Sequence, residues 1–484
     1  MSAPSIAAPT PSGGKAPKST GGRPSRTTEV VLLIAALALV TIALLIVEGS
    51  QEQSISPDII KFIVAYAVLF ALAHLVIRFF APYADQTLLP VVAALNGLGL
   101  VMIHRLDLGS ARTDELAKQV ERTHNADQQL LWAFLGMTAF AVVLFFLRDH
   151  RTLARYAYTL GAGGLIFLAL PAILPSSLSE INGSKNWIRT PVFSIQPGEF
   201  SKILLIIFTA AFLVSRRDMF TTAGKHFLGV DFPRARDLGP LLGAWAIAVG
   251  VLGFENDLGL PLLLFVTLLA MLYIATERVS WVMLGVSMFA VAVVAAYYVF
   301  PHFQVRVQIW LDPFAQYDTY GYQIAQSLFG LATGGLFGTG LGSGRPNIVP
   351  FANTDFILTS FGEELGLFGL AAITLLYFIF VYRGLRTAVT VRDSFGKLLA
   401  AGLSFTIAVQ LFVVFGGIAK LIPLTGLTSP FLSYGGSSLL ANYLLLAVLV
   451  RISNAAREPD APKPRRQPNG GGLEAMATQV VPRA

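Results

Sequence analysis

Long apolar runs alternate with short polar segments along most of this chain. A helix needs about 20 mostly apolar residues to cross a lipid bilayer. By that measure the pattern predicts about twelve membrane-spanning helices, covering residues 29–47, 57–77, 88–103, 129–147, 157–175, 200–214, 238–253, 259–275, 281–299, 358–382, 398–419 and 436–450. The expected fold class is therefore all-α, a polytopic transmembrane helix bundle with long irregular extracytoplasmic loops.

The composition supports a membrane location. Hydrophobic residues make up 54% of the 484 residues and charged residues only 13%, with a mean hydropathy of +0.65. A soluble protein carries about twice that share of charge, so a single large water-soluble core is excluded. Cysteine is absent, which excludes disulfides, thiolate nucleophiles and cysteine metal sites. The six histidines form no HxxxH pair, so a histidine metal site is not expected.

The charges predict the orientation in the membrane. Residues 1–28 and 456–484 are basic, proline-containing tails without a core pattern, and we expect both to be disordered. With an even number of spans both tails share one side. The segments on that side hold 24 Lys and Arg against 10 Asp and Glu, and the rest of the chain is net acidic. Because basic loops stay inside, both termini are predicted to be cytoplasmic in a plasma membrane. The basic pI then needs no nucleic-acid partner.

Two groups of charged residues lie beside predicted spans. Glu255 and Asp257 lie at the outer turn before the span at 259–275. There either one of the two carboxylates is a general base whose pKa is raised by desolvation, or the loop is solvated and Asp257 is the N-cap of that helix. Glu199 and Lys202, at i and i+3, share one helix face and can pair. That pair is either a structural bridge or part of a ligand site.

Two outer segments, and a pair of acids between them, have unusual composition. The loop at 300–357 is rich in aromatic residues and glycine, and we expect it to fold as a cap with short helices of its own. Its glycine run at 334–344 lacks the Lys-Ser/Thr and strand of a nucleotide loop. Glu363 and Glu364 follow it, either binding a cation or favouring a helix N-terminus. The weakly charged segment at 420–438 is expected to be a re-entrant cavity wall. These features predict an outward cavity of an enzyme or a transporter.

Several motifs together resemble the SEDS family of bacterial cell-wall proteins, which includes RodA, FtsW and SpoVE. The sequence of these motifs is more similar to RodA than to FtsW. The matching strings, in family order, are Gly97–Ile103, Asn182-Gly183 with Trp187-Ile188, Gln196-Pro197 with Glu199 and Lys202, Asp257-Leu258-Gly259, Tyr322-Gln323 with Gln326-Ser327, Gly334–Gly344, Thr354-Asp355-Phe356, Gly362–Gly366, and Pro423-Leu424-Thr425-Gly426 with Ser433–Ser438. The resemblance covers roughly residues 85–455. It leaves two extra helices at 29–84, giving twelve spans where the family has ten.

The resemblance implies a peptidoglycan glycosyltransferase that polymerises lipid II at the outer face of the plasma membrane for elongation, cell shape or division. It implies a class B penicillin-binding protein and other cell-wall proteins as partners, and a divalent cation, Mg²⁺ or Mn²⁺, as cofactor. The rival interpretation is a lipid II flippase. The family's Glu-Pro-Asp-Leu-Gly-Thr is here Glu255-Asn256-Asp257-Leu258-Gly259-Leu260, so the aspartate is kept while two neighbours differ.

On this basis Asp257 is the expected catalytic base of an inverting transfer, which needs no carboxylate nucleophile. The developing charge on the pyrophosphate leaving group needs cations. The residues expected to bind substrate are Arg189, Glu199, Lys202, Arg306, Lys420 and Ser433. Those expected to shape the site are Trp187, Gln196, Pro197, Gly259, Glu363, Pro423, Gly426, Gly435 and Gly436, with Glu363 also a candidate metal ligand.

Overall fold

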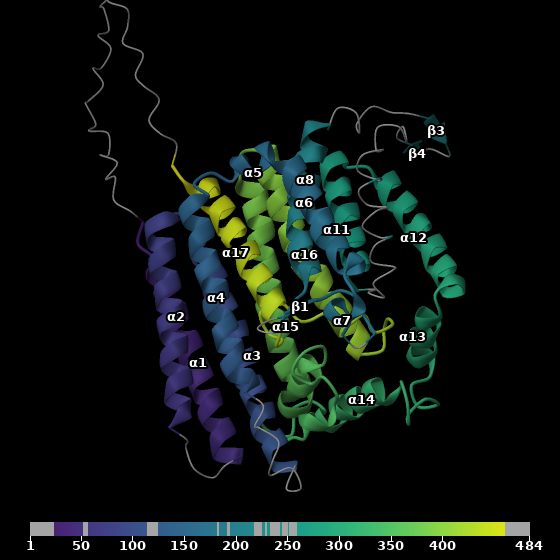
Figure 1. The fold of residues 1–484 in the computed structure, drawn as a ribbon. Helices are drawn as coiled ribbons and strands as arrows, with labels where there is room; N and C mark the ends of the chain where they lie inside the picture. The colour runs from purple at the N-terminus through teal and green to yellow at the C-terminus, as the bar shows by residue number, and fades with distance from the viewer. Residues whose placement is uncertain are drawn as a thin grey trace, which may run out of the picture.

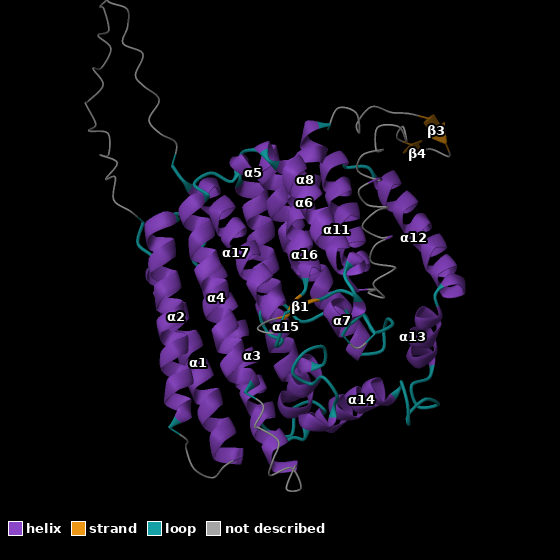
Figure 2. Ribbon diagram, viewed as in Figure 1, coloured by secondary structure: helices purple, strands orange, loops and turns teal. Residues whose placement is uncertain are grey.

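The computed structural model describes residues 24–51, 57–113, 124–181, 183–190, 194–216, 225–227, 230–232, 243, 250 and 259–459. These residues form a bundle of roughly parallel and antiparallel helices with four short strands (Figure 1, Figure 2). The helices are α1 Thr27–Gln51, α2 Asp58–Phe80, α3 Leu88–Thr113, α4 Asn125–Phe146, α5 Arg151–Arg155, α6 Ala157–Ile173, α7 Ser176–Ser179, α8 Pro197–Ser215, α11 Gly259–Thr276, α12 Val279–Val299, α13 Pro301–Leu311, α14 Tyr322–Gly334, the 3₁₀ helix η2 Pro346–Ile348, α15 Ile357–Thr390, α16 Ser394–Ile418 and α17 Gly436–Arg457. The all-α fold class predicted from the apolar runs is confirmed.

Within the described ranges, ten helices are long and apolar enough to cross a membrane. An eleventh, α6, is apolar but has 17 residues, and the span predicted at 238–253 lies outside the described residues except for Gly243 and Gly250. The chain is therefore a multi-pass membrane protein. The side chains that point away from the bundle are apolar, as on Ile34 and Ile42 of α1, because they face lipid and not water.

The two N-terminal helices lie at one edge of the bundle (Figure 1). Helix α1 packs along α3, and α2 packs against α4. Among the spans that the structure describes, helix α3 is the most buried, with 94% of its apolar window inside the structure. Buried polar contacts also join the pair to the rest: Glu48 of α1 lies 2.9 Å from the imidazole Nε2 of His104 on α3.

The remaining spans form the larger part of the bundle, in which α6 packs on α8, α15 on α16, and α17 on α4. One end of this bundle is built from irregular segments and short helices. It includes α7, the antiparallel strand pair β1 Ile188–Arg189 and β2 Ser194–Ile195, and the helices α13 and α14 that follow α12. A second antiparallel pair, β3 Lys225–Phe227 and β4 Val230–Phe232, lies near the opposite end (Figure 2). We call the end where α17 terminates at Arg457 the tail end, and the other the cavity end.

Candidate active site

A large cavity opens at the cavity end of the bundle. Its volume is about 1610 Å³, which exceeds the roughly 300–1,000 Å³ typical of a small-ligand pocket. The start of α4, the segment between α7 and α8, α13, the start of α14, the segment before α15 and the segment between α16 and α17 all contribute to its wall. The lining includes Trp132, Asn186, Trp187, Gln196, His302, Arg306, Gln323, Asp355, Thr425, Gly426, Thr428, Gly435, Gly436 and Ser437.

Helix α13 supplies the basic part of this wall. His302, Val305, Arg306 and Ile309 recur at helical spacing and all line the cavity, so one face of α13 is turned toward it. The Arg306 guanidinium donates to the carbonyl oxygens of Leu424 and Thr425 at 3.1 and 3.4 Å. Burial, and then the positive charge of Arg306, lower the pKa of His302 below its usual value of 6.5. The imidazole is therefore neutral at pH 7.

The segment between α16 and α17, residues 419–435, forms the floor of the cavity. Its backbone is satisfied by surrounding helices: Tyr377 donates to the Pro430 carbonyl at 2.5 Å, and the Asn96 amide donates to the Phe431 carbonyl at 3.3 Å. The Ser433 hydroxyl donates to the Thr354 carbonyl at 2.6 Å and accepts from the Ser429 N–H at 2.9 Å. Irregular backbone at membrane depth is stable only when it is paired in this way.

Glu199 and Lys202 lie behind this floor. Both are almost wholly buried, and the Lys202 ammonium is 2.5 Å from a Glu199 carboxylate oxygen and 3.1 Å from the Gln410 amide oxygen. The Gln410 amide nitrogen in turn donates to the Thr428 carbonyl at 2.8 Å. Because Thr428 lines the cavity, this chain of contacts supports the floor from below.

Glu363 and Glu364 hold the glycine-rich segment 334–344. The Glu363 carboxylate accepts the Arg345 N–H at 2.6 Å, and the Glu364 carboxylate accepts the Gly342 N–H at 2.9 Å and the Arg105 Nε–H at 2.9 Å. Neither glutamate lines the cavity. In the ranges that the structure describes, no group of three or more His, Cys, Asp or Glu side chains is placed to hold a metal ion. The described part of the site at Glu363 therefore does not fit a protein-caged cation.

The structure separates the predicted site residues into three sets. Those that line the cavity are Trp187, Gln196, Arg306, Gly426, Gly435 and Gly436. Those that do not line it are Arg189, Pro197, Glu199, Lys202, Gly259, Glu363, Lys420, Pro423 and Ser433. Arg189 is exposed, and the Lys420 carbonyl accepts the Trp310 indole N–H at 3.1 Å. Asp257 lies outside the described residues.

Gly259 connects Asp257 to the cavity floor along the chain. It is the first residue of α11 and follows Asp257 by two positions. A β-carbon added at Gly259 would lie 2.6 Å from the Leu427 side chain and 3.1 Å from the Thr425 carbonyl oxygen. The start of α11 therefore packs directly against the segment that lines the cavity.

Comparison with known families decides what this bundle is. The model for FtsW, RodA and SpoVE, described as "Cell cycle protein", matches residues 86–458. The chain belongs to the SEDS family.

Its relatives place it near the RodA members of that family. The Mycobacterium tuberculosis "Peptidoglycan glycosyltransferase RodA" is 58% identical over 95% of this chain and 96% of that protein. The Bacillus subtilis "Stage V sporulation protein E" is 34% identical over 76% of this chain and 98% of that protein. The prediction from the motifs, that the chain is a SEDS protein nearer to RodA, is confirmed.

Solved structures of SEDS proteins share the fold. One reported under "Structural coordination of polymerization and crosslinking by a peptidoglycan synthase complex" has a TM-score of 0.61 at 25% identity and covers 78% of this chain and 99% of that chain. Thermus thermophilus RodA has a TM-score of 0.54 at 25% identity, covering 78% and 98%. These solved structures therefore share their fold with most of this chain.

Sequence reasoning missed three lining residues of this SEDS protein. Asp355 was available as part of Thr354-Asp355-Phe356 but was given no role. His302 lies at i−4 from Arg306, a spacing that shows only if residues 301–311 are treated as a helix. Trp132 packs so tightly on Gly436 that an added β-carbon would lie 2.2 Å from its ring. No short motif marks that contact, because 304 residues separate the two partners.

Proposed function

We propose that this SEDS protein, a peptidoglycan glycosyltransferase like its relatives, polymerises lipid II in the large cavity, with Asp257 as the general base. The observation that carries the proposal is the cavity itself, about 1610 Å³ and lined by residues from several of the SEDS motifs. The family match and the 58% identity over nearly the whole chain support the activity.

The lining suits a lipid-linked sugar. Asn186, Gln196 and Gln323 offer amides, and Ser437 offers a hydroxyl, which are the neutral groups that pair with sugar hydroxyls. Trp132 and Trp187 offer flat apolar faces beside them. An extended apolar wall with a few convergent polar groups is the general character of a binding site.

The proposed reaction forms one bond and breaks one. The 4-hydroxyl of one disaccharide attacks the anomeric carbon of another while its proton passes to the Asp257 carboxylate. The bond from that carbon to the pyrophosphate oxygen breaks, and polyprenyl pyrophosphate leaves with the electron pair. A single displacement inverts the anomeric carbon, so an α-linked donor gives a β-linked product.

Arg306 is the residue we propose for the pyrophosphate. It is the one arginine or lysine among the described residues that line the cavity, and a guanidinium can bind phosphate oxygens in a bidentate manner. Its two bonds to carbonyl oxygens of residues 424 and 425 fix its position. Lys202 is less suited to this role because it is buried and engaged by Glu199 and Gln410.

The orientation and the partners are also proposed. The excess of basic residues in the tails and tail-end loops supports a cytoplasmic tail end, which turns the cavity outward. A class B penicillin-binding protein is the proposed partner, because a structural neighbour was solved in a complex that joins polymerisation and crosslinking. A divalent cation would neutralise pyrophosphate oxygens, and we propose that it is held mainly by them.

The test is polymerisation of fluorescent lipid II by the full-length protein with its penicillin-binding partner in detergent. Asp257→Asn is expected to lower the rate at least about 100-fold, the lower bound for a general base. Asp318→Asn, which makes the same change on an exposed carboxylate between α13 and α14, is the matched control and should polymerise like wild type.

Two results would overturn the proposal. Equal polymer from wild type and Asp257→Asn would remove Asp257 as the base while leaving the transferase. Absence of polymer from every variant, with the partner shown to be bound, would contradict a polymerase, and lipid II translocation in vesicles would then be measured for the flippase.

A further inference from the structure

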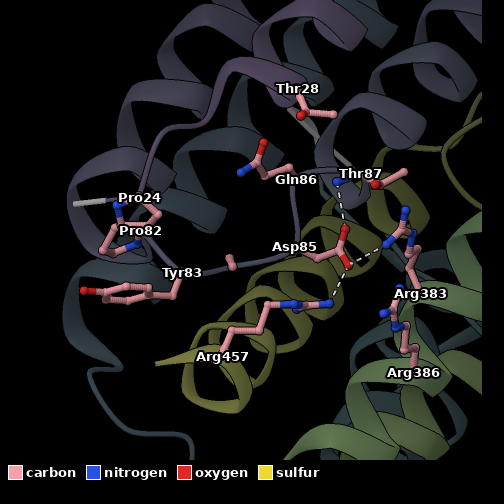
Figure 3. Close-up of a pocket in the computed structure, with 11 residues that line it drawn as sticks. Pro24, Thr28, Pro82, Tyr83, Asp85, Gln86, Thr87, Arg383, Arg386 and Arg457 are labelled. Atoms are coloured by element: carbon pink, nitrogen blue, oxygen red, sulfur yellow. Dashed lines mark hydrogen bonds and ion pairs between the residues drawn. The ribbon is translucent and has the colours of Figure 1, made fainter. Parts of the chain in front are cut away.

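A second cavity lies at the tail end of the bundle, opposite the first. Its volume is about 520 Å³. Spanning helices end around it: α2 at Phe80, α17 at Arg457, and α3 begins there at Leu88. The residues that line it are Pro24, Thr28, Pro82, Tyr83, Ala84, Asp85, Gln86, Thr87, Arg383, Arg386 and Arg457 (Figure 3).

Asp85 is the single acid of this pocket and is already engaged. Its carboxylate lies 2.6 Å from an Arg457 guanidinium nitrogen and 3.5 Å from one of Arg383. It also accepts the Thr87 N–H at 2.8 Å, and its own N–H donates to the Ser453 hydroxyl at 2.9 Å. Asp85 is only 4% exposed, so these bonds fix the floor of the pocket.

The arginines carry more charge than Asp85 neutralises. Three guanidinium groups face one carboxylate, which leaves the described pocket lining with two excess positive charges. Arg383 and Arg386 are three residues apart on α15, so they share one helix face and repel each other. Arg386 is exposed, and no dashed line joins its side chain to any other residue drawn (Figure 3).

The N-terminal segment completes this pocket. Pro24 and Thr28 line it, and the buried Arg26 side chain between them donates to the carbonyl oxygens of Pro82 and Ala84 at 2.9 and 3.0 Å. The family match begins only at residue 86. The pocket is therefore a joint product of the extra N-terminal helices and the SEDS core.

We propose that this pocket binds the phosphate of an anionic phospholipid headgroup. Basic pockets between spanning helices are the usual sites for such headgroups. Gln86, Thr28 and Thr87 add neutral donors beside the arginines. Phe80, at the end of α2, is 39% exposed and offers apolar surface for an acyl chain.

The helix macrodipole alone does not account for this arrangement. A cation near the C-terminus of a helix is favourable by itself, which explains an arginine near the end of α15 or of α17. It does not explain an open space of about 520 Å³ between them, nor why two like charges on one face of α15 point into it. An anion in that space accounts for both.

The experiment compares lipid retention by the full-length protein in nanodiscs of phosphatidylcholine with one fifth phosphatidylglycerol. Native mass spectrometry after detergent release counts each lipid retained. Wild type is expected to retain phosphatidylglycerol in preference, and Arg386→Gln to reduce the preference about fivefold, since each basic residue near a lipid surface contributes about 1 kcal/mol. Arg386→Gln removes no described ion pair, so folding should be unaffected. Arg148→Gln, an exposed arginine at the same end outside the pocket, is the matched control.

A second arm tests the source of the phosphate. Inorganic phosphate is titrated onto the protein in nanodiscs of phosphatidylcholine alone, with thermal stability as the readout. Stabilisation by millimolar phosphate that Arg386→Gln abolishes, without any phosphatidylglycerol preference, would overturn the lipid and assign the pocket to a soluble phosphate. Equal lipid retention by wild type, Arg386→Gln and Arg148→Gln would overturn the site altogether.

Discussion

Arg105 and Glu364 form a buried ion pair that joins α3 to the first turns of α15. The Arg105 Nε lies 2.9 Å from a Glu364 carboxylate oxygen, and both side chains are at most 2% exposed. A second Arg105 nitrogen donates to the Gly344 carbonyl at 2.8 Å, while Glu364 also accepts the Gly342 N–H. The pair therefore fixes the glycine-rich segment 334–344 between two spanning helices.

Removing one partner of this pair should destabilise the protein strongly. Glu364→Gln or Arg105→Met leaves an uncompensated buried group, which costs about 3–5 kcal/mol. The double variant should lose less than the sum of the two, because neither charge then remains unpaired. Thermal unfolding in detergent measures this, with the exposed Arg148→Met as control. Single variants with the same unfolding temperature as wild type would contradict a stabilising role for the Arg105–Glu364 pair.

The Glu199–Lys202 pair is expected to act through the cavity floor and not through contact with substrate. Lys202→Met should lower the unfolding temperature, because Glu199 is left buried without its cation. Lys202→Met combined with Glu199→Leu should recover most of the loss and keep the KM for lipid II within about twofold of wild type. A KM that rises at least tenfold in the folded double variant would show a direct substrate contact.

Much of the fold follows from the apolar pattern. Spans such as α1 and α16 are long, uninterrupted and apolar, so their lengths alone predict them. The pattern treats α6 as a span although it has only 17 residues. Short helices are predicted within the loop at 300–357, but the bounds of α13 are not, because residues 301–311 are amphipathic and short, and their helix is stabilised by packing against a floor more than 100 residues away.

The candidate site was less predictable than the fold. Local motifs led to Gln196, Gly426 and Gly435, which do line the cavity. Spacing alone could not separate Lys202, which is buried behind the floor, from Arg306, which faces the cavity. That difference depends on which helix face meets residues 419–435, a long-range contact that a single sequence does not encode locally.

Gly366 is required by the backbone where α15 meets the glycine-rich segment. Its φ of 65° and ψ of −166° interrupt the helix, and an added β-carbon would lie 2.4 Å from the Gly338 nitrogen. Gly366→Ala should cost about 1–3 kcal/mol, because this combination of positive φ and extended ψ is essentially restricted to glycine, with the steric clash in addition. Gly163→Ala on α6 is the control: apart from its own helix backbone and chain neighbours, no atom of the described residues lies within 4 Å of its β-carbon position, and alanine favours a helix. Equal unfolding temperatures for Gly366→Ala and Gly163→Ala would contradict the requirement for glycine at position 366.

His302 should make the cavity end sensitive to acid. Burial and Arg306 lower its pKa below 6.5 in the folded protein, so the unfolded chain binds the proton more tightly. The share of the stability that depends on neutral His302 is then fully present above pH 6.5. It is lost as the pH falls through the lowered pKa of the folded protein. Between pH 7.5 and 5.5, the unfolding temperature of His302→Gln should fall by less than that of wild type. His124→Gln, with an exposed imidazole before α4, should keep the wild-type loss, and a His302 variant as acid-sensitive as wild type would contradict the cause.

Removal of divalent cations should abolish polymerisation without unfolding the protein. The pyrophosphate leaving group needs positive charge, yet no cluster of three metal-binding side chains exists in the described ranges, so the ion should bind with substrate and contribute little to the free protein. Chelation by EDTA is expected to stop polymer formation while leaving the unfolding temperature unchanged, and Mn²⁺ or Mg²⁺ should restore activity. Glu363→Gln should leave the Mn²⁺ concentration for half-maximal activity unchanged, because the Glu363 carboxylate is bound to the Arg345 N–H. A large rise in that concentration for Glu363→Gln would make Glu363 a metal ligand after all.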